Sequence, residues 1–139
     1  MAVCTRMISV RSRGDCDVTD ITSQVAEAVE DSGLLEGLVH VFVTGSTAGV
    51  TTIEFESGLL SDVKGFFERI APQGDVYAHN ERWHDGNGHS HIRASLLGPS
   101  VSLPVVEGRL ATGTWQQIIA VEMDVRPRDR TILVRVVGS

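Results

Sequence analysis

The sequence contains little cysteine and no long apolar run, and each absence excludes a class of protein. Its 139 residues include only two cysteines, Cys4 and Cys16, which form no Cys-x-x-Cys pair. Free thiols in a reducing compartment are therefore favoured over a disulfide framework. No apolar stretch approaches the roughly 20 residues that a membrane-spanning helix needs. Because the N-terminus also lacks a long apolar region followed by a cleavage site, we expect a cytoplasmic protein with no membrane partner.

Basic residues are scarce as well. The chain has 12 Lys and Arg against 18 Asp and Glu, which gives a net charge of −6. Nucleic acids are bound by stripes of Lys and Arg, and no stripe exists here, so we expect no nucleic-acid partner. The one basic cluster, Arg126–Arg130, contains Pro127 and Asp129 and is typical of a solvated turn. The sequence has no Gly-x-Ser-x-Gly elbow, P-loop or dinucleotide-binding fingerprint.

The length favours one domain, residues 1–139, that can bury a core without disulfides. Apolar residues at helical spacing predict one helix over residues 20–32 and another from Ser57 to Ile70. Apolar runs between Gly and Pro turns predict strands over 5–12, 38–44, 50–56, 89–97, 100–106, 109–111, 115–124 and 130–137. Two helices in the first half, followed by closely spaced strands, indicate the α+β class with a β-sandwich or a barrel.

Four of the five histidines lie in one segment, at positions 79, 84, 89 and 91. On the predicted strand 89–97, the side chains of His89 and His91 leave the same face, roughly 6.5 Å apart along the chain. Two imidazoles at this spacing suit one divalent ion, and His79 could add a third ligand from the preceding extended segment. A carboxylate could complete the site; the candidates are Glu54, Glu81 and Asp85. The alternative is a set of polar loop histidines that hydrogen-bond to these carboxylates.

Residues next to the histidines suit a phosphorylated ligand. Arg93 and Ser95 follow His91 at strand spacing, which places a cation and a hydroxyl on its face. Ser46 and Thr47 lie in a small-residue turn whose backbone amides and hydroxyls could bind an anion, although an ordinary turn has the same composition. Asn87 belongs to Asp85–Gly88, whose composition indicates a turn first and a ligand-approach loop second.

An indole lies at the entrance of the predicted strand 115–124. Trp115 could stack on an aromatic ligand while Gln116 hydrogen-bonds to its edge. A packed Trp in the core or in an interface is the alternative. His40 lies within an apolar strand and favours a core or interface histidine over a ligand.

These motifs together resemble the YjbQ family, whose members are often labelled secondary thiamine-phosphate synthase enzyme. The matching segments are in the family's order and cover nearly the whole chain: Ser46-Thr-Ala-Gly-Val-Thr-Thr-Ile-Glu54, His79, Asp85-Gly-Asn-Gly-His-Ser-His-Ile-Arg-Ala-Ser-Leu-Leu-Gly-Pro-Ser100, Val105-Val-Glu-Gly-Arg-Leu110, Gly113-Thr-Trp-Gln116 and Arg126-Pro-Arg128. The resemblance implies a compact α+β fold of β-sandwich-like antiparallel sheets with two flanking helices. It also implies a homotrimer with a ligand and metal pocket near the histidines, close to subunit contacts.

One position departs from the family pattern. Many members have a histidine directly before the Ser/Thr-Thr-Ala-Gly turn, where this chain has Gly45. The chain therefore resembles a variant branch, in which the role of that histidine is either moved to His89 or absent.

Two hypotheses of function follow. In the first, a transferase joins a pyrimidine-methyl pyrophosphate to a thiazole phosphate; His79, His89 and His91 hold a divalent ion, Zn or Mg. Glu54, His89 and Arg93 are its catalytic candidates, and the substrate-binding candidates are Ser46, Thr47, Asn87, Ser95, Trp115 and Gln116. Metal-assisted hydrolysis of a phosphate ester is a variant of this hypothesis. In the second, a non-catalytic oligomer binds a metal or a small phosphorylated ligand.

Overall fold

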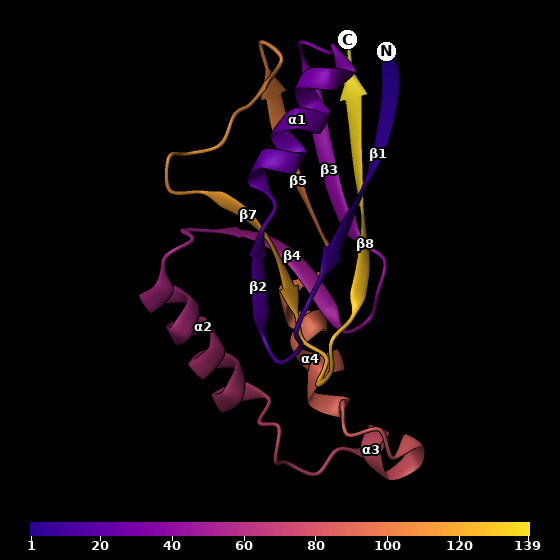
Figure 1. The fold of residues 1–139 in the computed structure, drawn as a ribbon, viewed down its shortest axis with the longest axis vertical. Helices are drawn as coiled ribbons and strands as arrows, with labels where there is room; N and C mark the ends of the chain where they lie inside the picture. Colours follow the sequence, from indigo (N-terminus) through magenta and orange to yellow (C-terminus); the bar gives the residue numbers. More distant parts are fainter.

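The computed structural model describes residues 1–139 as two antiparallel sheets and four helices. Sheet A has the strand order β1-β8-β3-β5-β6, with bounds Ala2–Arg11, Asp129–Gly138, Gly37–Val43, Ser100–Val106 and Arg109–Leu110. Sheet B has the order β2-β7-β4, with bounds Asp17–Asp20, Gln117–Glu122 and Ala48–Ile53. Both chain termini lie at one end of sheet A, and helices α3 and α4 lie at the other end (Figure 1). The predicted α+β class with β-sandwich-like antiparallel sheets is confirmed.

The main core lies between sheet A, helix α1 (Thr22–Ser32) and sheet B. Strand β7 in sheet B is buried on both faces, because Ile118 and Ala120 enter this core while Ile119 and Val121 enter a second, smaller cluster. The sequence of a strand buried on both faces is a continuous apolar run, without the alternation of apolar and polar residues found in a half-buried strand. Sheet B is thus the middle layer of the molecule.

Helix α4 (Gly88–Leu97) covers the other face of sheet B, and Gly49 on β4 allows its close approach. A Cβ atom at Gly49 would lie 2.6 Å from Leu97 Cδ2 and 2.8 Å from the Gly98 carbonyl oxygen. The Val50 N–H also donates to that carbonyl, at 3.0 Å. Any larger residue at position 49 would push the end of α4 away from the sheet.

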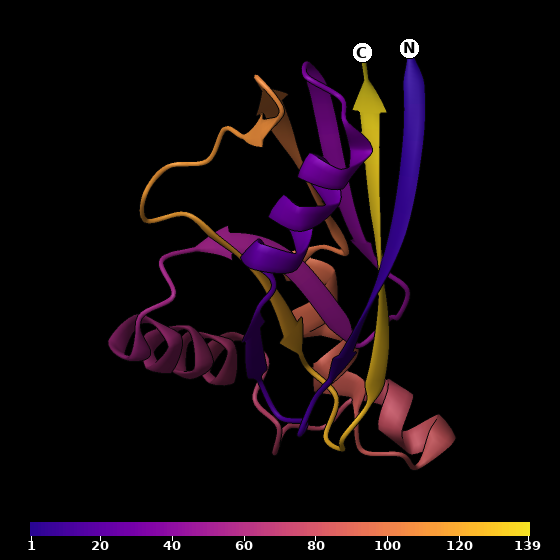
Figure 2. The same cartoon turned by 45° about the horizontal axis from the view of Figure 1, so that its top comes forward.

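Helix α2 (Ser57–Ile70) stands out from the two sheets (Figures 1 and 2). The Glu56 carboxylate caps its first turn by accepting from the N–H groups of Gly58 and Leu59. Phe67 is the only buried residue of the helix, whereas Phe66 and Ile70 are exposed. The protein therefore carries an apolar helix face that its own sheets do not cover.

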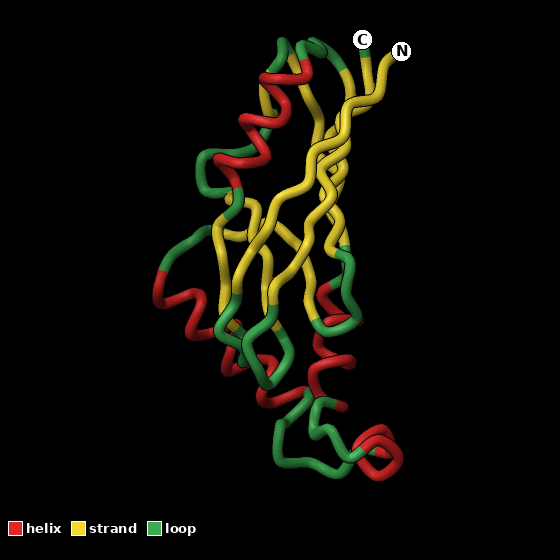
Figure 3. The backbone as a smooth tube through the Cα atoms, turned by 45° about the vertical axis from the view of Figure 1, so that its right-hand side comes forward, coloured by secondary structure: helices red, strands yellow, loops and turns green.

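The predicted strand over residues 89–97 is wrong, because this segment is helix α4. The segment around His79, predicted as extended, is helix α3 (Ala78–Trp83). Figure 3 draws both as helices at the end of the molecule opposite the chain termini. The hydrophobic pattern of α4 was misleading because its buried face is mostly polar or small: Gly88, His89, Ser90, Arg93 and Ala94. These positions recur every three to four residues, which is the helical period.

One further difference concerns a short strand. Strand β2 was not predicted from the sequence; only four residues long, it is half-buried throughout. No helix has both the length and the apolar character needed to cross a bilayer.

Candidate functional site

The candidate site is a cleft of about 220 Å³ between helix α4 and the turn that joins β3 to β4. The turn contributes Gly45 and Ser46, and the helix contributes His91 and Ser95. His91 and Ser95 are one helical turn apart, so they share a face of α4. The Ser95 hydroxyl donates to the His91 carbonyl at 2.7 Å. The cleft therefore combines an imidazole with two hydroxyl groups.

His89 does not share this cleft. Residues two apart on a helix point to nearly opposite sides, so His89 faces inward and is only 1% exposed. Its ring lies 6.3 Å from that of Tyr77, and its Nδ1 atom has no hydrogen-bond partner. Burial, together with the charge of Arg93, lowers the pKa of His89, so the neutral imidazole is favoured. The expected pairing of His89 with His91 on one face is wrong for this reason.

Arg93 also points away from the cleft. It is four residues after His89 and shares its inner face. Its Nε atom donates to the Ala71 carbonyl at 2.9 Å, and its Nη2 atom donates to Glu68 at 2.6 Å. Arg93 therefore ties α4 to the end of α2 instead of lying beside His91 as the strand period predicted.

His79 comes from helix α3 and lies against His91. The two ring centroids are 4.5 Å apart. The Nδ1 atom of His79 lies 3.3 Å from an Asp85 carboxylate oxygen, but the contact lacks hydrogen-bond geometry. The structure thus brings together two of the three histidines predicted to bind a metal.

The three histidines predicted from the sequence as metal ligands do not converge on one point in the structure. No group of three or more His, Cys, Asp and Glu side chains is arranged to hold one. The physical reason is the helical period of α4, which separates His89 from His91. Only His79 and His91 remain close enough to share a ligand.

Three further predicted residues lie at the other end of β4. Ser46 and Thr47 precede this strand and Glu54 follows it. The length of the strand therefore separates Glu54 from Ser46 and Thr47 by about 20 Å. Gln116 lies near Glu54, because its Nε2 atom donates to Thr52 Oγ1 at 3.2 Å. Trp115 is 72% exposed. Within one chain, Glu54, Trp115 and Gln116 do not join the cleft.

A buried charge network behind the cleft was missed from the sequence. Glu122 and Asp124 follow the apolar run of β7 and are 3% and 1% exposed. Arg130 donates to Glu122 from Nε at 2.7 Å and from Nη2 at 2.5 Å. Arg128 donates to Asp124 from Nε at 3.0 Å and from Nη2 at 2.7 Å. The basic cluster is therefore a solvated turn only at Arg126, Pro127 and Asp129, which are exposed, whereas Arg128 and Arg130 bind buried acids.

This network holds two of the predicted binding residues. The Thr47 hydroxyl donates to Asp124 at 3.0 Å and accepts from Arg130 at 2.7 Å. The Asn87 amide nitrogen lies 3.4 Å from Asp124, and in the alternative amide orientation it donates to Asp85 at 2.9 Å. Both side chains are buried. Thr47 and Asn87 thus support the turns around the cleft from behind.

The electrostatics of Asp124 follow from these contacts. Burial by itself would raise its pKa, but hydrogen bonds from the Val125 N–H, Arg128 and Thr47 outweigh burial and hold the pKa below its usual value. The carboxylate therefore stays ionised and keeps the β7–β8 turn in place next to the cleft.

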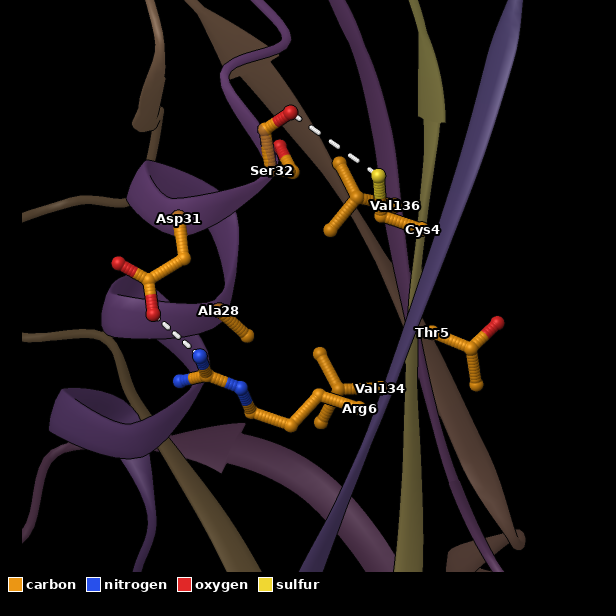
Figure 4. Close-up of a pocket in the computed structure, with 8 residues that line it drawn as sticks. All are labelled: Cys4, Thr5, Arg6, Ala28, Asp31, Ser32, Val134 and Val136. Atoms are coloured by element: carbon orange, nitrogen blue, oxygen red, sulfur yellow. Dashed lines mark hydrogen bonds and ion pairs between the residues drawn. The ribbon is translucent and has the colours of Figure 1, made fainter.

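Two other hollows are weaker candidates. One, of about 170 Å³, lies between β1 and α1; there Arg6 pairs with Asp31, and Cys4 Sγ lies 3.9 Å from the Ser32 carbonyl oxygen (Figure 4). The other is an open groove of about 660 Å³ beside α2, whose Lys64 pairs with Asp15 at 3.4 Å. In both, the cation is already paired and no histidine is present.

The family pattern described as UPF0047 protein YjbQ-like matches residues 6–139. The chain belongs to this family. A UPF0047 protein of Methanothermobacter thermautotrophicus is 41% identical over 139 residues, which cover all of this chain and 95% of the relative. The YjbQ protein of Escherichia coli O157:H7 is 35% identical over 97% of this chain and 96% of its own length.

Solved structures agree with this family membership. A YbjQ-like protein of unknown function from Sulfolobus solfataricus superposes with a TM-score of 0.95, with 36% identity over 99% of both chains. A YjbQ/UPF0047 protein from Clostridium acetobutylicum has a TM-score of 0.87, with 34% identity over 95% of this chain and 99% of its own. The YjbQ family fold is thereby established, whereas the names of these relatives assign no activity.

Proposed function

We propose that this YjbQ-family protein binds a small phosphorylated or pyrophosphorylated molecule in the cleft between the β3–β4 turn and α4. The observation that carries the proposal is the meeting of Ser46 and His91 in one cleft. The Ser46 hydroxyl has no hydrogen-bond partner within the chain and is exposed, so it is free to donate to a phosphate oxygen. His91 can donate a proton or a hydrogen bond to the same ligand.

The reaction that we propose is a thiamine-phosphate synthase-like transfer. The bond between the pyrimidine methylene carbon and the pyrophosphate oxygen breaks, and a bond to the thiazole nitrogen forms. Pyrophosphate leaves with the bonding electron pair. His91 would stabilise this leaving group by proton donation, and His79 beside it would hold the imidazole in place.

In this proposal, only two residues would bind a divalent ion, Zn or Mg. His79 and His91 would hold it, because their rings are adjacent, and His91 would then act as a ligand in place of its role as proton donor. When bound, the ion would neutralise pyrophosphate charge. His89 would not take part, since it is buried on the opposite side of α4.

We also propose that the protein is a homotrimer. The exposed apolar side chains on α2, together with Trp115, suit burial against other copies of the chain. A second copy could also bring Glu54, Trp115 and Gln116 toward the cleft. Light scattering should then give about three times 15.0 kDa, and a 15.0 kDa particle would contradict the trimer.

A non-catalytic ligand-binding protein is the second candidate. It is favoured by Gly45, which stands where many members of the family have a histidine. The two candidates share the cleft but differ in turnover.

The test measures the formation of thiamine phosphate by the purified protein, with and without Zn or Mg. The matched control for His91→Ala is His40→Ala, since His40 is exposed on sheet A and contacts only Ser102 and Phe42 among polar or aromatic groups. We expect turnover to fall about a hundredfold in His91→Ala and to stay unchanged in the control. Binding of pyrophosphate without turnover supports the second candidate. Absence of both binding and turnover would overturn the proposal.

A further inference from the structure

We infer that Arg130 binds an anion beside Gly45, at the edge of the cleft, and that the missing side chain at Gly45 admits its guanidinium group. The inference rests on the proposed function, because it adds a residue to that site. It also assigns the chemical class of the group that is bound, namely the oxygens of a phosphate or pyrophosphate.

The guanidinium of Arg130 occupies the space in which a side chain at position 45 would begin. A Cβ atom built on Gly45 would lie 2.5 Å from Arg130 Nη1 and 3.5 Å from Arg130 Cζ. A carbon and a nitrogen that are not bonded cannot approach to 2.5 Å, so any other residue at position 45 would displace the guanidinium. Glycine here has a defined consequence: it lets Arg130 reach the turn that lines the cleft.

One nitrogen of Arg130 is left without a partner. The Nε and Nη2 atoms are bound to Glu122, and Nη2 also donates to Thr47. The Nη1 atom makes no hydrogen bond within the chain. The only buried side-chain polar atoms without a partner are Nδ1 of His79 and Nδ1 of His89, so Nη1 of Arg130 reaches solvent. Its two N–H groups are therefore available to a ligand beside Gly45.

Glu122 fixes the direction of these N–H groups. The two-point contact with Glu122 and the bond to Thr47 hold the planar guanidinium in one orientation. The Arg130 side chain is 12% exposed. Because Glu122 balances the charge of Arg130, the contribution to anion binding comes from directed hydrogen bonds more than from net charge. Lysine would replace this planar two-point contact with a single nitrogen, which leaves no separate N–H group directed at the space beside Gly45.

The experiment titrates pyrophosphate and inorganic phosphate into the wild type by isothermal calorimetry, and then into Gly45→Ala and Arg130→Lys. Gly45→Ala displaces Nη1 without removing any charged group, and it covers the case in which Arg130→Lys fails to fold. Arg11→Lys is the control, because Arg11 lies on β1 and pairs with Asp129 at the surface. We expect roughly tenfold weaker pyrophosphate binding in both variants and no change in the control.

The outcomes separate the inference from the proposed function. Pyrophosphate binding to the wild type that is unchanged in folded Gly45→Ala overturns the role of Arg130 and leaves the proposed function standing. A wild type that binds neither anion overturns both.

Discussion

The imidazole rings of His79 and His91 lie against each other, with centroids 4.5 Å apart, although they belong to different helices. His79 is on α3 and His91 is in the first turn of α4. Their meeting depends on the turn Asp85–Gly88, where the Gly88 N–H donates to the Asn80 side chain at 2.8 Å. Of the pair, His91 lines the cleft and His79 lies against its ring.

Zinc binding should depend on this pair and not on His89. Two imidazoles are fewer than the three or four protein ligands of typical zinc sites, so we expect weak binding. Titration with zinc chloride should show binding that is lost in His79→Ala and in His91→Ala and retained in His89→Ala. Tight, stoichiometric zinc that disappears in His89→Ala would restore the three-histidine centre.

Acidification should destabilise the fold through His89. Burial and the charge of Arg93 lower its pKa in the folded state, so the unfolded chain, with a His pKa of about 6.5, binds the proton more readily. The free energy of unfolding should therefore fall as the pH drops below about 6.5. The lowered pKa of Asp124 adds a further loss only in more acidic solution, below about pH 4.

Urea unfolding between about pH 7.5 and pH 5 measures this dependence. His89→Gln should flatten the slope, whereas His40→Gln, a change at an exposed position, should keep it. An unchanged slope in His89→Gln would show that another group is responsible.

Removal of the Thr47 hydroxyl should loosen the charge network. This hydroxyl links Asp124 to Arg130, and Thr47→Val leaves both buried groups with one partner fewer. We expect the free energy of unfolding to fall by about 1–3 kcal/mol. Thr114→Val, in an exposed loop, is the control. Equal stability of the two variants would contradict the bridging role of Thr47.

Gly49→Ala should displace the end of helix α4. The new methyl group would meet Leu97 Cδ2 at 2.6 Å and the Gly98 carbonyl oxygen at 2.8 Å, and the carbonyl is backbone that cannot turn aside. We expect a loss of about 1–3 kcal/mol in thermal or urea unfolding. Gly74→Ala is a matched control, because a Cβ there has no atom within 4 Å. A stable Gly49→Ala variant would mean that α4 packs more loosely than described.

Much of the fold follows from local hydrophobic pattern. The strand predicted over 100–106 coincides with β5, and the helix predicted from Ser57 to Ile70 coincides with α2, because their apolar spacing is unambiguous. Helix α4 was not predicted as a helix, because polar side chains occupy its buried face. His89 and Arg93 are buried by contacts with residues distant in the sequence, and a hydrophobicity scale cannot predict such contacts.

Ser46, His91 and Ser95 line one cleft, although the strand predicted for His91 and Ser95 is a helix. Their role in binding a ligand stays a prediction. Arg130 was missed because its partner, Glu122, lies across the β7–β8 turn, eight residues away. A usable signal was present, since Glu122 and Asp124 directly follow a buried apolar run, where unpaired acids would be costly.

Binding of a phosphorylated ligand in the cleft beside His91 can be observed directly at the histidine side chains. The most direct measurement follows the imidazole nitrogen and carbon-bound proton signals of all five histidines by NMR during titration with pyrophosphate. We expect the signals of His91 and His79 to shift together and saturate, while those of His40 stay in place. Signals that remain unchanged at His91, or that shift only at His40, would contradict it.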